Sequence, residues 1–162
     1  MADTLHLGQD LHLGFVADEE GRFFAGPYTW VDLQAEERRD VTPRTRDLGV
    51  VSGRANLVQS LILRLKTERG ELAALGHPTY GSRHHRLIGE LNTETNRNLL
   101  KLYVLECLRQ EPRLESIASL EVRPVEGRER RGEVQVHASL IVKDHPDPLN
   151  LVIPFSFEAL LG

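Results

Sequence analysis

Among its 162 residues the chain has one cysteine, 6% aromatic residues and no long apolar run. A single cysteine cannot form an internal disulfide, and Cys107 falls among apolar residues of a predicted helix, which favours a buried, inert thiol. No apolar stretch approaches the roughly 20 residues that cross a bilayer, and no basic segment followed by an apolar one marks a secretory signal. The sequence therefore predicts a protein of a cytosol-like compartment with no membrane partner.

Basic residues are not in excess, since the formal net charge is -4. Two short basic clusters, at residues 38–39 and 128–131, are interrupted or flanked by acids, which is typical of solvated loops. The sequence therefore predicts no nucleic-acid partner.

Motifs of the common metal, phosphate and nucleophile sites are also missing. Seven histidines are present, but His84 and His85 are adjacent and would point about 100° apart on a helix. No Cys-x-x-Cys or His-Glu-x-x-His spacing completes a zinc site, and there is no P-loop and no Gly-x-Ser-x-Gly elbow. We therefore predict neither a metal nor another cofactor.

What the sequence does contain is apolar periodicity, which predicts three helices between residues 47 and 112. The first helix has its apolar residues at helical spacing: Leu57, Val58, Leu61, Ile62 and Leu65. This face leaves Gln59 and Arg64 mostly outward. The apolar residues of a short second helix are Leu87, Ile88 and Leu91. Thr93 is positioned to cap the third and longest helix.

After Pro112 the period changes to two, which predicts three strands within residues 113–162. Pro154 cannot donate to a ladder, so the last strand is predicted to lie at an exposed edge. Residues 1–46 contain short extended patterns and a polar connection, which favours an N-terminal extended arm. The predicted fold is α+β: the arm, then three helices, then a three-stranded antiparallel sheet with an exposed edge, the last two forming one domain over residues 47–162.

The junction of helix and sheet is the triplet Glu111, Pro112 and Arg113. Proline stops the helix and fixes the acid and the base on a short turn. The planar guanidinium of Arg113 suits a carboxylate or helix-end carbonyls of a neighbouring chain. It equally suits the end of a helix in its own domain, and the sequence leaves both interpretations open.

Four short motifs occur in order: Asn-Leu-x-Gln at 56–59, Arg-Leu-x-Thr-x-x-Gly-Glu at 64–71, Pro-x-Tyr-Gly at 78–81 and Glu-Pro-Arg at 111–113. Together they resemble the baseplate wedge, or sheath-initiator, family of contractile phage tails and injection systems, also called lysozyme-like. The match covers residues 47–125, and Leu-Gly-Gln-Asp-Leu-His-Leu near the start is similar to the family's opening segment. The segment 23–46 departs from the pattern, since it is longer and more charged. Tyr80 and Gly81 are interpreted as a tight turn packed between helices.

The resemblance implies a structural, non-enzymatic protein assembled in the cytoplasm into the baseplate of a tail-like particle. Larger wedge subunits would bind at Glu111, Pro112 and Arg113, and hub or tube proteins are further candidates. Sheath protein would bind the last strand, where the implied contact residues are Leu149, Leu151, Ile153, Phe155 and Phe157.

Two alternatives come from other classes of protein. One is a tail-associated enzyme that cleaves peptidoglycan with a carboxylate pair such as Glu71 and Glu90. No spacing in the sequence forces these two groups to meet in a cleft. The other is an adaptor domain that binds peptides by adding a strand to the exposed edge.

Overall fold

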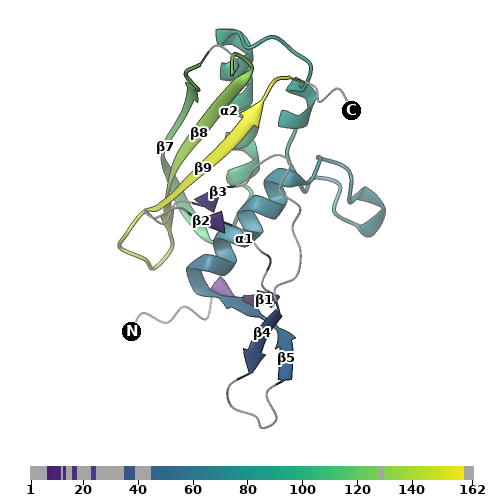
Figure 1. The fold of residues 1–162 in the computed structure, drawn as a ribbon, viewed down its shortest axis with the longest axis vertical. Helices are drawn as coiled ribbons and strands as arrows, with labels where there is room; N and C mark the ends of the chain where they lie inside the picture. Colours follow the sequence, from purple (N-terminus) through teal and green to yellow (C-terminus); the bar gives the residue numbers. More distant parts are fainter. Residues whose placement is uncertain are drawn as a thin grey trace.

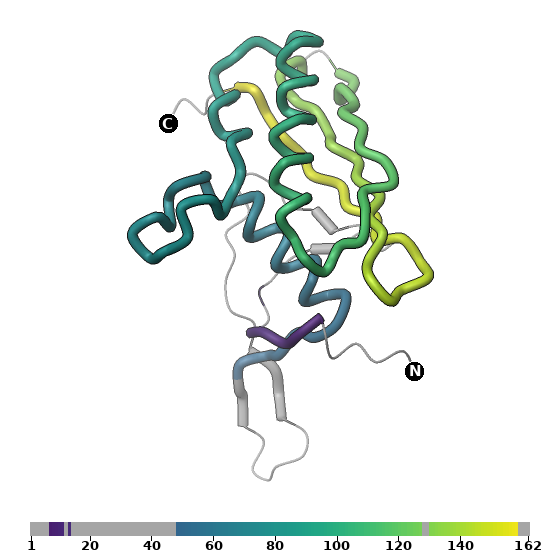
Figure 2. The backbone as a smooth tube through the Cα atoms, turned by 180° about the vertical axis from the view of Figure 1, so that it is seen from behind, coloured from purple at the N-terminus to yellow at the C-terminus, as the bar shows by residue number. Residues whose placement is uncertain are grey.

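The computed structural model describes residues 7–11, 13, 16–17, 23–24, 35–38, 45–127 and 130–158. Figure 1 shows a twisted sheet with two α-helices, α1 (Gly53–Lys66) and α2 (Glu94–Leu108). Seen from behind in Figure 2, both helices lie on the same face of the sheet. The apolar core fills the space between these two layers. None of the described helices is long and apolar enough to cross a membrane.

Both helices form where the apolar stripe predicts them. In α1 the side chains of Leu57, Leu61 and Leu65 are buried together against the core. The N-terminus of α2 has the predicted cap, because the Thr93 hydroxyl accepts a hydrogen bond of 3.2 Å from the Asn96 backbone N–H. This bond satisfies one of the N–H groups that a helix start leaves unpaired.

The predicted second helix is wrong. Its sequence forms only a 3-10 turn, η3 (His84–Leu87), and another 3-10 turn, η2 (Ala73–Leu75), lies before it. Gly81 and Gly89 have φ angles of +97° and +92°, so residues 82–88 between them are too few for a stable α-helix. Of the expected apolar face only Leu87 is buried, while Ile88 and Leu91 are 47% and 77% exposed.

The C-terminal half forms the predicted antiparallel meander within a larger sheet. Five strands lie in the order β2 (Val16–Ala17), β3 (Phe23–Phe24), β9 (Leu149–Ser156), β8 (Glu133–Val142) and β7 (Leu114–Pro124). The predicted alternation in β8 is confirmed by burial of every second residue: Val134, Val136, Ala138, Leu140 and Val142. These side chains face the helices and build one wall of the core.

The prediction of a three-stranded sheet ending in an exposed edge at β9 is also wrong. β3 pairs with β9 in parallel, placing Phe23 opposite Leu151 and Phe24 opposite Val152. Such a short pairing partner, distant in the sequence, leaves no periodic pattern to detect. Pro154 lies beyond the stretch that β3 covers. Within the described residues the edge strand on the other side of the sheet is β7.

Two short ladders complete the described structure. β1 (Gln9–Leu11) pairs with β6 (Val50–Ser52), and β4 (Ala35–Arg38) pairs with β5 (Thr45–Leu48), both antiparallel. Parts of the predicted N-terminal arm, β1 and β3, therefore pair with strands that lie beyond residue 46. The division of the chain into domains at that residue stays a prediction.

Candidate functional site

Glu111 lies in a tight corner between α2 and β7. The helix ends at Leu108, before Pro112, as the sequence predicts. The backbone N–H of Glu111 donates to the Leu108 carbonyl at 3.1 Å, and its own carbonyl accepts from the Leu114 N–H at 3.2 Å. These two bonds turn the chain sharply and leave Glu111 only 4% exposed. The corner buries a carboxylate and must compensate its charge.

Arg113 supplies that compensation with two parallel hydrogen bonds. Its Nε donates to Oε1 of Glu111 at 2.6 Å, and its second terminal nitrogen donates to Oε2 at 3.0 Å. A second guanidinium, that of Arg64 on α1, approaches Oε2 at 3.7 Å. Burial alone would raise the pKa of Glu111, but the bonds and charge of Arg113, together with the charge of Arg64, outweigh it and lower the pKa. A carboxyl with a lowered pKa stays ionised at neutral pH and is a poor general acid.

Arg113 also reaches the N-terminal segment. Its first terminal nitrogen donates to the Leu7 carbonyl at 3.1 Å, and the same oxygen accepts from the Asn56 side-chain amide at 2.8 Å. The Leu7 side chain is fully buried in the core. The next carbonyl, that of Gly8, accepts from the Gly53 N–H at 3.2 Å. The corner and the start of α1 thus hold the opening segment from two sides.

Gln59 continues this attachment one turn further along α1. Its amide nitrogen donates to the Leu11 carbonyl at 2.7 Å, and its amide oxygen accepts from the Leu13 N–H at 2.9 Å. The prediction that Gln59 and Arg64 point outward is wrong, since Gln59 is 3% exposed and the Arg64 side chain 14%. The missed signal is an amide pair, Asn56 and Gln59, three residues apart beside the apolar stripe. At that spacing both amides share a face of the helix.

The Arg64 guanidinium is stacked on the ring of Tyr80, with 4.4 Å between its central carbon and the ring centre. Burial raises the pKa of Tyr80. Gly81 follows with φ of +97°, and a Cβ there would lie 2.6 Å from the Thr67 carbonyl oxygen. The predicted tight turn is present but begins earlier, since the Tyr80 N–H donates to the His77 carbonyl at 3.3 Å. Gly81 then brings the chain against the end of α1, where the Ser82 N–H donates to the Thr67 carbonyl at 2.9 Å.

All four sequence motifs therefore meet in one network, which we call the corner network: Asn56, Gln59, Arg64, Tyr80, Glu111 and Arg113. Its described contacts lie within the chain. Arg113 bonds the Glu111 carboxylate and the Leu7 carbonyl, where one interpretation of the sequence expected helix-end carbonyls. Binding of a partner at residues 111–113 stays a prediction. At this corner Pro112 is exposed and the Arg113 side chain is 22% exposed.

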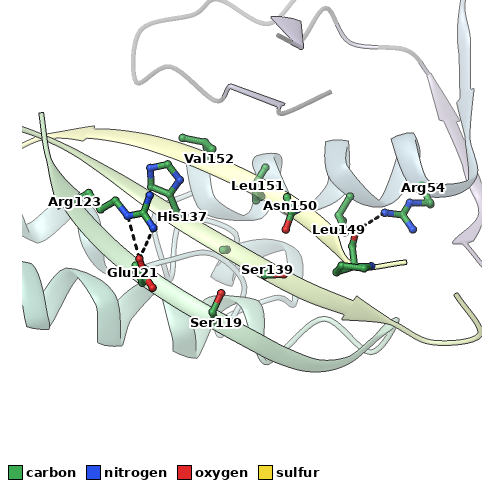
Figure 3. Close-up of a pocket in the computed structure, with 12 residues that line it drawn as sticks. Arg54, Ser119, Glu121, Arg123, His137, Ser139, Leu149, Asn150, Leu151 and Val152 are labelled. Atoms are coloured by element: carbon green, nitrogen blue, oxygen red, sulfur yellow. Dashed lines mark hydrogen bonds and ion pairs between the residues drawn. The ribbon is translucent and has the colours of Figure 1, made fainter. Parts of the chain in front are cut away.

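The outer face of the sheet, away from the helices, carries a second polar group of residues (Figure 3). Glu121, Arg123 and His137 line a depression of about 520 Å³ there, together with Ser119 and Ser139. Arg123 donates two hydrogen bonds to Oε2 of Glu121, at 3.0 and 2.6 Å. These bonds and the charge of Arg123 lower the pKa of Glu121. This carboxylate is therefore also unsuited to general-acid catalysis.

The five residues predicted to contact sheath are all in the core, each at most 6% exposed: Leu149, Leu151, Ile153, Phe155 and Phe157. Their side chains pack in the apolar core between the sheet and the helices. Sheath binding to the last strand stays a prediction, and it would have to use backbone atoms or outward-facing neighbours. Glu71 and Glu90, the carboxylates of the enzymatic alternative, are exposed and line neither of the depressions described in this structure.

Two other reactive side chains, Cys107 and His84, are buried. Cys107 is 1% exposed, which confirms the predicted burial, and burial raises its pKa to about 12, in keeping with the inert thiol that the sequence predicts. His84 donates to or accepts from the Ser82 hydroxyl at 2.8 Å, and its burial, with the neighbouring His85, lowers its pKa to about 3. The part of the chain that the structure describes contains no cluster of three or more metal-ligating residues.

Comparison with known proteins gives a match among solved structures. No protein-family model matches the chain, and no curated protein does so. Among solved structures, the chain is similar to a crystal structure from Geobacter sulfurreducens named a "putative tail lysozyme". The two share 26% identity with a TM-score of 0.55, over 65% of this chain and 91% of the other. Over the matched 65% of its length, this chain shares the fold of the protein that carries this name. The resemblance found in the motifs is supported to that extent, and membership of the wedge family stays a prediction.

Proposed function

We propose that the chain is a structural subunit of the baseplate of a contractile tail or injection particle. The observation that carries the proposal is the fold it shares with a tail protein over 91% of that protein's length. In this role the corner at residues 111–113 meets larger wedge subunits, and the C-terminal sheet receives the first ring of sheath.

The corner network supports the wedge contact by making the corner rigid. Two arginines and a buried carboxylate fix the turn, and Pro112 presents a fixed backbone angle at its exposed tip. A preformed surface loses little entropy on binding, which favours assembly.

The sheet supports the sheath contact through β7. Within the described residues no strand pairs with the edge of β7 that faces away from β8. Its register with β8 shifts between Leu114 and Ser116 and between Ile117 and Ser119, and such irregularities discourage strand addition. The regular stretch from Leu120 to Pro124 is the part of this edge best suited to a strand from sheath.

Deleting the gene in the phage or strain that carries it tests the role directly. We expect electron micrographs of the deletion lysate to show tubes without sheath, because the subunit that joins wedge to sheath is missing. Complementation with the wild-type gene should restore sheathed particles. Normal sheathed particles in the deletion lysate would refute the structural role.

A peptidoglycan-cleaving enzyme remains the second candidate, because the similar structure carries a lysozyme name. The same deletion separates the two functions, since loss of an enzyme would leave complete particles that fail to open the cell wall. Cell-wall cleavage by the purified chain, abolished by Glu71→Gln or Glu90→Gln, would establish that candidate.

A further inference from the structure

Residues 67–83 protrude from the end of α1 (Figure 2). A depression of about 600 Å³ is lined by residues of this segment and of the ends of α1 and α2. Arg64 and Arg69 line it from the end of α1, His77 and Tyr80 from the protruding segment, and Gln110 from the end of α2. No carboxylate is among the described residues that line it. The charged side chains in this lining, Arg64 and Arg69, are therefore both basic.

Arg64 has donor capacity that the described structure leaves unused. Its Nε is buried and has no hydrogen-bond partner among the described residues. Its approach to Glu111, at 3.7 Å, is longer than a hydrogen bond. Arg113 is the closer partner of Glu111, since both carboxylate oxygens accept from it. A buried donor without an acceptor costs free energy, so the Arg64 guanidinium is incompletely compensated within the described structure.

Arg69 is similarly under-compensated. Its terminal nitrogen lies 4.0 Å from Oε2 of Glu106, and the same oxygen accepts a hydrogen bond from Arg83. Around the depression four arginines, at 64, 69, 83 and 113, thus share two glutamates, at 106 and 111. The lining of the depression itself contains two of these arginines, Arg64 and Arg69, and no carboxylate, on a chain whose net charge is -4.

We propose that this depression binds a carboxylate side chain from an acidic segment of another protein. Two guanidinium groups provide planar, multidentate donors that match a carboxylate. A nucleic acid is the less suitable partner, because the cations form one compact group on an acidic protein instead of a track along a backbone. The inference concerns chemistry at this surface and holds independently of the proposed baseplate role.

The test is an NMR titration of the isotopically labelled full chain with a hexaglutamate peptide, and with hexaglutamine as the uncharged control. We expect amide shifts confined to residues 64–80 and 110 with hexaglutamate and none with hexaglutamine. Arg69→Gln should weaken the binding about fivefold, the effect of losing one exposed ion pair. Arg86→Gln removes the same charge from an exposed position outside the depression and should leave the affinity unchanged.

Three results would overturn the proposal. The first is the absence of shifts in residues 64–80 at any peptide concentration that keeps the protein folded. The second is equal weakening by Arg69→Gln and Arg86→Gln, which would mean diffuse attraction without a site. The third is tighter binding of a six-nucleotide oligothymidine than of hexaglutamate at the same salt concentration, since the depression would then select phosphate.

Discussion

Among the described residues, two Glu-x-Arg pairs of identical spacing form ion pairs, Glu111 with Arg113 and Glu121 with Arg123, and they differ mainly in where the fold places them. In each, the arginine two residues after the glutamate bonds its carboxylate at a shortest distance of 2.6 Å. The side chains of Glu111 and Arg113 are 3% and 22% exposed, whereas those of Glu121 and Arg123 are 56% and 60% exposed. The same local sequence pattern thus gives a buried structural pair in one place and a solvated surface pair in the other.

The difference follows from the backbone on which each pair is built. Alternate residues of a strand point to the same face, so Glu121 and Arg123 meet on the outer side of β7 without help from the rest of the fold. Glu111 and Arg113 meet across the turn that follows α2, and there Arg113 also bonds the Leu7 carbonyl. A Glu-x-Arg motif therefore indicates that the two side chains can interact. Only the surrounding fold determines whether stability depends on that interaction.

The largest expected difference between the pairs is in stability. Arg113→Ala leaves the Glu111 carboxylate buried with Arg64 as its remaining partner, so we expect the free energy of unfolding to fall by about 3 kcal/mol. Arg123→Ala removes the matching residue from the surface pair and should produce no resolved change. Urea denaturation of both variants, followed by circular dichroism, measures the difference. Equal effects of the two substitutions would show that burial does not distinguish the pairs.

A smaller effect is expected in the coupling between Arg113 and Asn56, because both donate to the Leu7 carbonyl oxygen. In a double-mutant cycle of Asn56→Ala with Arg113→Ala we expect a coupling energy of about 1 kcal/mol. The same cycle with Arg123→Ala should be additive, since Arg123 lies on the other face of the sheet. Additivity in both cycles would mean that the opening segment does not depend on the corner network.

Those parts of the fold that depend on local pattern were predictable from the sequence. Leu57, Leu61 and Leu65 identify the buried face of α1, Thr93 identifies the start of α2, and strict alternation identifies β8. Each of these signals lies within one element, where the period of the backbone determines which side chains share a face.

What escaped prediction depends on pairs of segments far apart in the chain. The partner of β9 is the two-residue strand β3, which is too short to show any period. Asn56 and Gln59 look like ordinary polar residues until the segment that they bind is placed beside them. The motif Glu-Pro-Arg was correctly located at the junction of helix and sheet, but its bond to Leu7 spans most of the chain.

The smallest expected difference between the pairs is in the pH dependence of stability. The pKa of Glu111 is lower in the folded state than the ordinary value of about 4.3 for a glutamate in an unfolded chain. Its stabilising contribution is therefore complete above that ordinary value and is lost as the pH falls through the folded-state pKa. Glu111→Gln removes this titration, so the variant should lose less stability than the wild type between pH 7 and pH 3.

Glu121→Gln is the matched control, because the pKa of Glu121 is also lowered but its pair is exposed to solvent. Salt should separate the two contributions, since ions screen exposed charges far more than buried ones. In 1 M sodium chloride the Debye length is about 3 Å. There Glu121→Gln should no longer change the pH dependence of stability, while Glu111→Gln still should. If salt abolished both effects equally, the Glu111 carboxylate would be in contact with solvent. The distinction between a buried and an exposed pair would then fail.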